Sequence, residues 1–182
     1  MPDFSRIDIA QLLDAVDGAP TNDAKGAALE ALGRYLFETF EEVECRGQNI
    51  LEGPRAQELD LVFWNDQRTS ELYFLEALLI VECKATGSRV SSRDVGWFVR
   101  KLQDHGAHVG ILIALNGITG DGDTAAHSEV LSALLRDKIR ILLLTRGEIV
   151  SCETTSELAD LLKEKVLKLT LEKAVHVREE LH

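Results

Sequence analysis

The chain has 182 residues, 45% of them hydrophobic and 28% charged, and its formal net charge is −11. This composition is typical of a folded globular domain and excludes a disordered chain, and no apolar run approaches the ~20 residues that a membrane-spanning helix requires. The acidic total argues against a protein that coats nucleic acid, because phosphate binding depends on clustered lysine and arginine.

Charge is unevenly distributed along the chain. Residues 1–60 carry 5 basic and 13 acidic side chains (−8), residues 61–120 carry 6 of each (0), and residues 121–182 carry 9 and 12 (−3). A local basic patch is therefore expected in the middle third. The acidic N-terminus lacks the pattern of a signal peptide, and the three cysteines are widely separated, as is typical of a reducing compartment. We expect a cytoplasmic protein without membrane contact.

The first half of the chain combines helical and extended patterns. Apolar residues at helical spacing predict a short helix over residues 5–17. A long amphipathic helix follows the turn GAPTND and is expected to run to about Glu42. Residues 43–46 predict a short edge strand. ELDLVFW (58–64) alternates apolar and polar residues and predicts a strand, whereas SELYFLEA (70–77) fits either a strand continuation or an inserted turn.

The second half contains continuous apolar runs that predict strands buried on both faces: LLIVECK (78–84), VGILIAL (109–115) and IRILLLT (139–145). Helices are predicted between them, one capped by Ser91 or Ser92 and ending near Asp104, the other over residues 124–137. A final helix of roughly 25 residues begins near Ser156, longer than the usual three to four turns. The order predicts an α/β domain with a mixed sheet and helices on both sides.

Glu82 and Lys84 are unexpected at the end of a buried strand. Successive strand residues point to opposite faces, so these two side chains share one face and Cys83 points to the other. A structural ion pair is one interpretation, since buried lysine and glutamate are normally paired. A metal and water site at a strand end is the other, and it requires further carboxylates from neighbouring elements.

Asp60 is the candidate for the second carboxylate. If strands 58–64 and 78–84 are adjacent, Asp60 can lie beside Glu82 on the same face. Burying two carboxylates together is unfavourable without a cation. Mg²⁺ accepts a few carboxylates and leaves its other positions to water and phosphate oxygens. A neighbouring lysine can orient or activate the attacking water, or stabilise charge in the transition state.

With these residues in this order, the sequence resembles the PD-(D/E)xK nuclease superfamily, especially archaeal Holliday-junction resolvases and Mrr-type restriction endonucleases. KGAALE (25–30) is similar to the opening helix motif, QELDLVF carries Asp60, and VECKAT carries Glu82 and Lys84. The resemblance covers residues 24–145. It implies a restriction-endonuclease-like αβββαβ core with a central mixed sheet, preceded by a short helix and followed by a long one.

The resemblance also implies a role for each site residue. Asp60 and Glu82 would be the principal Mg²⁺ ligands, joined by the backbone carbonyl of Cys83, and Mn²⁺ would substitute for Mg²⁺. Glu30 would complete the metal site from its helix, directly or through water, although on pattern alone it reads as a solvated acid. Lys84 would act on the nucleophilic water.

Five basic residues are candidates for contact with nucleic acid: Lys25, Arg89, Arg93, Arg100 and Lys101. Arg89 and Arg93 flank a helix N-terminus, which itself favours phosphate. A solvated helix face is the alternative interpretation of this group, and Lys25 fits an ordinary surface residue equally well. Arg46 and Arg55 are weaker candidates for the same contact.

The sequence therefore predicts a metal-dependent endonuclease that hydrolyses phosphodiester bonds in DNA. Its expected organisation is an N-terminal helical extension (1–23), a nuclease core (24–150) and a C-terminal helix (151–182). The final helix could close the domain, form a homodimer or bind a partner protein, and a sheet edge could also form a homodimer. The alternatives for function are a non-catalytic binding or assembly module with the nuclease fold, and a nuclease acting on RNA.

Overall fold

A computed structural model of the chain describes residues 4–50, 58–119 and 125–179. The elements, in chain order, are α1 (Arg6–Asp17), α2 (Asn22–Glu38), β1 (Val43–Ile50), β2 (Leu59–Asn65), β3 (Leu78–Cys83), α3 (Ser92–Asp104), β4 (Val109–Ile113), α4 (Ala125–Ser132), the π-helical turn η1 (Ala133–Asp137), β5 (Arg140–Leu144), α5 (Arg146–Ser151) and α6 (Thr155–Glu179).

The five strands of the described residues form one sheet in the order β1-β2-β3-β4-β5. The first three strands are antiparallel neighbours, and β3, β4 and β5 run parallel. Helix α3 makes the crossover between β3 and β4, as a parallel connection requires. The predicted α/β class, the αβββαβ order and the mixed sheet are confirmed.

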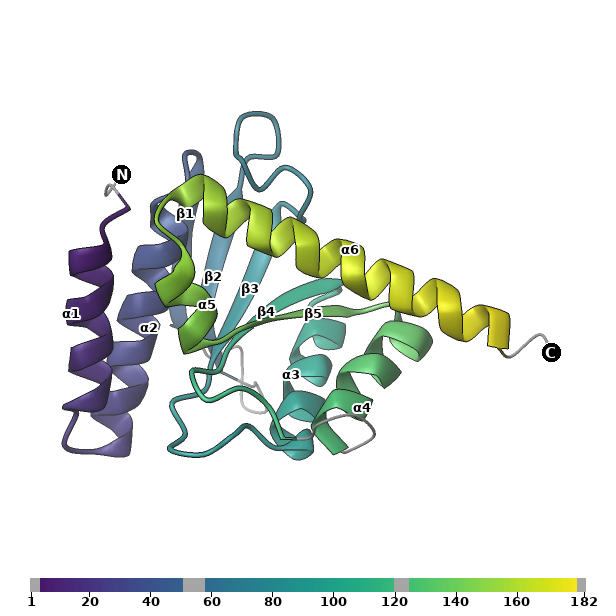
Figure 1. Cartoon of the computed structure of the whole chain (residues 1–182), viewed down its shortest axis with the longest axis horizontal. Coiled ribbons are helices and arrows are strands. Elements are labelled where there is room, and N and C mark those ends of the chain that lie inside the picture. Colours follow the sequence, from purple (N-terminus) through teal and green to yellow (C-terminus); the bar gives the residue numbers. More distant parts are fainter. Residues whose placement is uncertain (1–3, 51–57, 120–124, 180–182) are drawn as a thin grey trace.

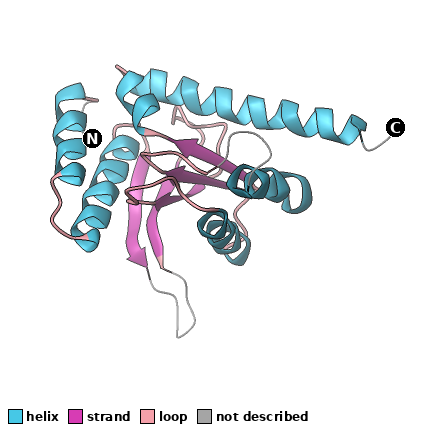
Figure 2. Cartoon of the chain, turned by 60° about the horizontal axis from the view of Figure 1, so that its bottom comes forward, coloured by secondary structure: helices cyan, strands magenta, loops and turns pink. Residues whose placement is uncertain are grey.

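Helices cover both faces of the sheet (Figure 1). One hydrophobic core joins α1, α2 and α6 to the face that carries Leu61, Val81 and Ile113. A second core joins α3 and α4 to the opposite face, which carries Ile80 and Leu112. The strands therefore lie between two helical layers (Figure 2), and polar side chains on the α3 face can be shielded from water.

Close approach of α3 to the sheet depends on Gly110 in β4. A Cβ atom at this position would come within 2.5 Å of Leu102 and 2.6 Å of Phe98, which are both side chains of α3. Because real Cβ contacts are longer, a side chain here would push the helix outward. Gly110 therefore helps to set the distance at which α3 residues reach the neighbouring strand β3.

Some element boundaries differ from the sequence prediction. Helix α2 ends at Glu38 rather than near Glu42, and β1 continues to Ile50 with a register shift between Cys45 and Gly47. SELYFLEA forms turns, so the inserted-turn alternative holds. Helix α5 was not predicted, although Thr145 and Glu148 form a capping box that the sequence shows as T-x-x-E.

Among the described residues, none of the helices has the length and apolar composition that a bilayer span requires. The long helix α6 is instead amphipathic. Leu158 and Leu162 are buried in the core, whereas Leu167 and Leu171, further along the same helix, are exposed.

Candidate active site

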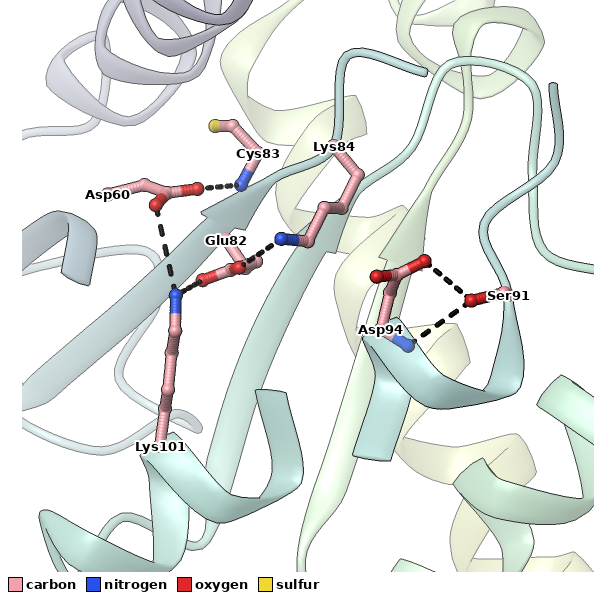
Figure 3. A network of polar contacts seen from close by, with 7 residues as sticks. All are labelled: Asp60, Glu82, Cys83, Lys84, Ser91, Asp94 and Lys101. Carbon is pink, nitrogen blue, oxygen red and sulfur yellow. Dashed lines mark hydrogen bonds and ion pairs between the residues drawn. The ribbon is translucent and has the colours of Figure 1, made fainter. Parts of the chain in front are cut away.

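The candidate site lies where β2 begins and β3 ends. These strands are antiparallel, and the pairing of Leu61 with Val81 places Asp60 next to Glu82. Lys84 follows the last residue of β3, and its backbone N–H donates to the carbonyl of Ile113 in β4 (2.9 Å). Sheet register thus brings the three residues predicted from sequence to one place (Figure 3).

Asp60 is held by the backbone of the neighbouring strand. The N–H of Cys83 donates to Asp60 Oδ2 at 2.7 Å. Burial and the negative charge of Glu82 nevertheless raise the pKa of Asp60 from its ordinary value of 3.8 to about 6. The raised pKa means that the surroundings of Asp60 do not fully compensate the negative charge of its ionised form. A metal ion next to this carboxylate would supply the missing positive charge.

Glu82 is almost fully buried, with 1% of its side chain exposed. Each of its oxygens contacts a lysine: Oε1 lies 2.7 Å from Lys84 Nζ, and Oε2 lies 2.6 Å from Lys101 Nζ. Burial disfavours the charged form of Lys84, but the ion pair with Glu82 outweighs it, so the pKa of Lys84 is raised. Lys84 is therefore a charged donor at neutral pH rather than a free base.

Lys101, predicted from sequence as a nucleic-acid contact, is buried beside the two carboxylates. Its side chain is only 11% exposed, and its ammonium also lies 3.9 Å from Asp60 Oδ1. The reason is helical phase. Lys101 lies three residues after the buried Phe98 and seven after Asp94. Residues at these spacings share one side of a helix, so Lys101 projects from the side of α3 that faces the sheet. A helical wheel of α3 could have found it.

Glu30, predicted to join the site from its helix directly or through water, forms hydrogen bonds with the neighbouring strand β1. Its Oε2 accepts hydrogen bonds from Gln48 and Asn49 at the end of β1, at 2.9 Å and 3.1 Å. Within the described residues, no group of three or more histidine, cysteine or acidic side chains is arranged to hold a metal ion. The structure therefore brings Asp60 and Glu82 together and leaves Glu30 with partners from β1.

Cys83 points away from the carboxylates, as predicted from strand alternation. Its thiol packs in the core beneath α2, close to the carbonyl of Leu29. Burial, followed by the nearby charges of Asp60 and Glu30, raises the pKa of this thiol well above its ordinary value. The contribution of Cys83 to the described site is its backbone N–H.

The remaining basic candidates are distributed over the surface. Arg93 and Arg100 are exposed on α3, Arg89 is exposed in the preceding loop, and Lys25 is half-buried in the first turn of α2. Arg46 pairs with Glu44 on β1 at 2.5 Å, whereas Arg55 lies outside the described residues.

Sequence analysis missed Trp97, which shares the surface of Arg93 and Arg100. This indole is 48% exposed, and the guanidinium of Arg100 lies 5.6 Å from its ring centroid. A hollow of about 430 Å³ is lined by these residues together with Ser92, Gly96 and Glu129. The sequence signal that could have indicated this surface was a tryptophan placed between two arginines in the same helix.

The mixed five-stranded sheet, with an aspartate on β2 and a Glu-x-Lys pair at the end of β3, defines the PD-(D/E)xK nuclease superfamily. A comparison with protein families agrees: the Mrr_cat model, described as a restriction endonuclease, matches residues 24–151. The chain belongs to this restriction endonuclease family and carries a nuclease domain of the Mrr type. A comparison with curated proteins found no match.

Proposed function

We propose that the protein is a metal-dependent endonuclease that hydrolyses phosphodiester bonds in DNA. The observation that carries the proposal is that two carboxylates from adjacent strands, Asp60 and Glu82, lie next to each other and that Glu82 contacts Lys84. This pair of carboxylates fits a divalent cation because the pKa of Asp60 is raised by burial and by Glu82. A bound Mg²⁺ would supply a water of lowered pKa and neutralise charge on the phosphate.

Charge balance supports this assignment. Asp60 and Glu82 together carry −2, and Lys84 and Lys101 carry +2, so the four groups are neutral among themselves. Addition of a divalent cation makes the set +2. That excess complements a phosphodiester and a hydroxide nucleophile, which carry one negative charge each. The site then attracts its substrate only when it is loaded with metal.

Lys84 would donate hydrogen bonds to the water nucleophile or to a phosphate oxygen. Its raised pKa favours stabilisation of developing negative charge over removal of a proton from water. The backbone carbonyl of Cys83 would be a further metal ligand. Glu30 would join the site through water, in exchange for its hydrogen bonds to Gln48 and Asn49.

The first test is cleavage of several substrates: supercoiled plasmid, linear duplex, a four-way junction, single-stranded DNA and an RNA duplex. We expect cleavage of a DNA substrate with Mg²⁺ or Mn²⁺ and none with EDTA, because the carboxylate pair is the metal site. Cleavage that persists in EDTA would contradict the proposal, and cleavage of RNA alone would redirect it to a ribonuclease.

Arg93, Trp97 and Arg100 are proposed to contact the nucleic acid beside the active site. Trp97 lies one helical turn before Lys101 on α3, so this surface adjoins the carboxylates. Its arginines complement phosphate, and the exposed indole offers a face for a base or sugar. Arg89 and Lys25 are proposed as further phosphate contacts.

Replacement of Trp97 by alanine is expected to weaken DNA binding by about tenfold, in the range found for loss of one base–aromatic stack. Binding should be measured by fluorescence anisotropy with Ca²⁺ in place of Mg²⁺. Trp64→Ala is a matched control, since Trp64 is also 48% exposed but lies on β2. Equal weakening by both variants would contradict a specific role for the α3 surface.

The second candidate function is a non-catalytic binding module. It is favoured by the pairing of Asp60 and Glu82 with Lys84 and Lys101, because these four charges balance without a metal ion. Its interaction surface would include Leu167 and Leu171 on α6, which are exposed and could pair two copies or bind a partner protein. Absence of metal binding by calorimetry, together with a stable dimer or complex, would favour this function over the nuclease.

A further inference from the structure

Lys101 is a buried cation whose place in the site calls for an explanation beyond that of Lys84. It comes from α3, the crossover helix that packs on the sheet face carrying Glu82, and its side chain is 11% exposed. A buried lysine is rare unless it is paired, and Lys101 is paired with both candidate metal ligands.

The contacts divide the four carboxylate oxygens into two sets. Asp60 Oδ2 accepts from the N–H of Cys83, and Glu82 Oε1 pairs with Lys84. The other two oxygens, Asp60 Oδ1 and Glu82 Oε2, are the ones that face Lys101 Nζ, at 3.9 Å and 2.6 Å (Figure 3). A divalent metal held by Asp60 and Glu82 would compete with Lys101 for these carboxylates.

We propose that Lys101 is an internal counter-cation that competes with the divalent metal for Asp60 and Glu82 and so sets the metal affinity of the site. The proposal rests on the proposed function of the carboxylate pair. In the metal-free protein, the ammonium offsets repulsion between the two carboxylates and holds them in place. When metal is bound, the Lys101 ammonium would move away from the carboxylates, which the flexible four-carbon stem of lysine permits without movement of α3.

The direct test is calorimetric titration of Mg²⁺ and Mn²⁺ into wild type and Lys101→Met. Methionine keeps the unbranched apolar stem and removes the charge. The variant is expected to bind metal about tenfold more tightly because its competitor is gone, a gain of about 1.4 kcal/mol. The titration should be done at pH 8, where protons compete little for Asp60, whose pKa is raised to about 6.

Two control variants separate competition from a general change of charge. Lys84→Met removes a charge from the other oxygen of Glu82 and leaves Oδ1 and Oε2 with Lys101. Arg100→Met removes an exposed charge from the adjacent position of α3. We expect a smaller gain in affinity for Lys84→Met and almost none for Arg100→Met. Equal gains in Lys84→Met and Lys101→Met, or unchanged or weaker binding by Lys101→Met, would overturn the proposal.

Thermal unfolding provides a second readout. In EDTA, Lys101→Met should have a lower Tm than wild type, because the two carboxylates lose their cation. Metal should raise the Tm of the variant more than that of wild type, since stabilisation grows with the ratio of ligand concentration to Kd. Lys101→Arg, which keeps the charge, should restore stability in EDTA. If Lys101→Met folds with Mg²⁺ but not in EDTA, this result also supports Lys101 as the counter-cation of the metal-free site. If metal raises the Tm of wild type and of Lys101→Met equally, the proposal is contradicted.

Failure of this proposal can be distinguished from failure of the proposed function. If wild type binds metal and cleaves DNA but Lys101→Met shows no gain in metal affinity, competition by Lys101 is excluded and the proposed nuclease function stands. Absence of metal binding by both proteins would overturn both proposals.

Discussion

Asp60→Asn is expected to abolish DNA cleavage, with a loss of at least about 100-fold, while the fold is retained. Removal of a single group that stabilises transition-state charge costs about 10²–10³ in rate, and this variant also removes a carboxylate that we propose as a metal ligand. Asparagine keeps an oxygen that can accept the N–H of Cys83, so the hydrogen bond of 2.7 Å between β2 and β3 need not be lost. Initial rates of plasmid cleavage in Mg²⁺ provide the measurement.

The dependence of stability on pH provides a second measurement on the same variant. Because the folded pKa of Asp60 is raised from 3.8 to about 6, its stabilising contribution is fully present below pH 3.8 and is lost as pH rises through about 6. Asparagine does not titrate. In EDTA, the Tm of Asp60→Asn relative to wild type should therefore increase between pH 4 and pH 7.

Asp104→Asn is the matched control, because Asp104 is an exposed aspartate at the end of α3. This variant should cleave DNA at the wild-type rate and show no comparable change in its relative Tm across the pH range. Cleavage by Asp60→Asn at more than a tenth of the wild-type rate would contradict a ligand role for Asp60. A falling relative Tm with rising pH would contradict the raised pKa.

Lys84→Met is expected to reduce cleavage by about 10²–10³ and to leave binding of DNA and metal in place. The reason is that Lys84 contacts Glu82 from one side and remains charged, so it can stabilise charge that develops on the reacting phosphate. Single-turnover cleavage at saturating Mg²⁺ separates this loss from any change in metal affinity.

Lys163→Met is the control for Lys84→Met, since Lys163 is a partly exposed lysine on α6 that pairs with Asp160. It should leave the cleavage rate unchanged. A loss of Mg²⁺ binding in Lys84→Met equal to its loss of cleavage would show that Lys84 acts through the metal site and not on the reacting groups.

The predictable part of the fold follows from local patterns. Continuous apolar runs identified β3, β4 and β5, and alternation identified β2, because strand side chains have a period of two residues. Asp60, Glu82 and Lys84 were singled out as candidates for the same reason: charges at the ends of strands that are otherwise apolar conflict with burial, and that conflict is visible in the sequence. Helix α5 and the extension of β1 were missed because both are short and polar.

The tertiary structure decided which of the charged residues meet. Lys101 has the same sequence context as Arg100, yet the phase of α3 turns one toward Glu82 and the other toward solvent. Glu30 matches a family motif, but its position relative to β1 gives it Gln48 and Asn49 as partners. The sequence alone determined the strand order along the chain and the Asp60, Glu82 and Lys84 set, since these depend on local periodicity. Only the packing of α3 against the sheet, which brings together residues far apart in the chain, decided that a second lysine contacts Asp60 and Glu82.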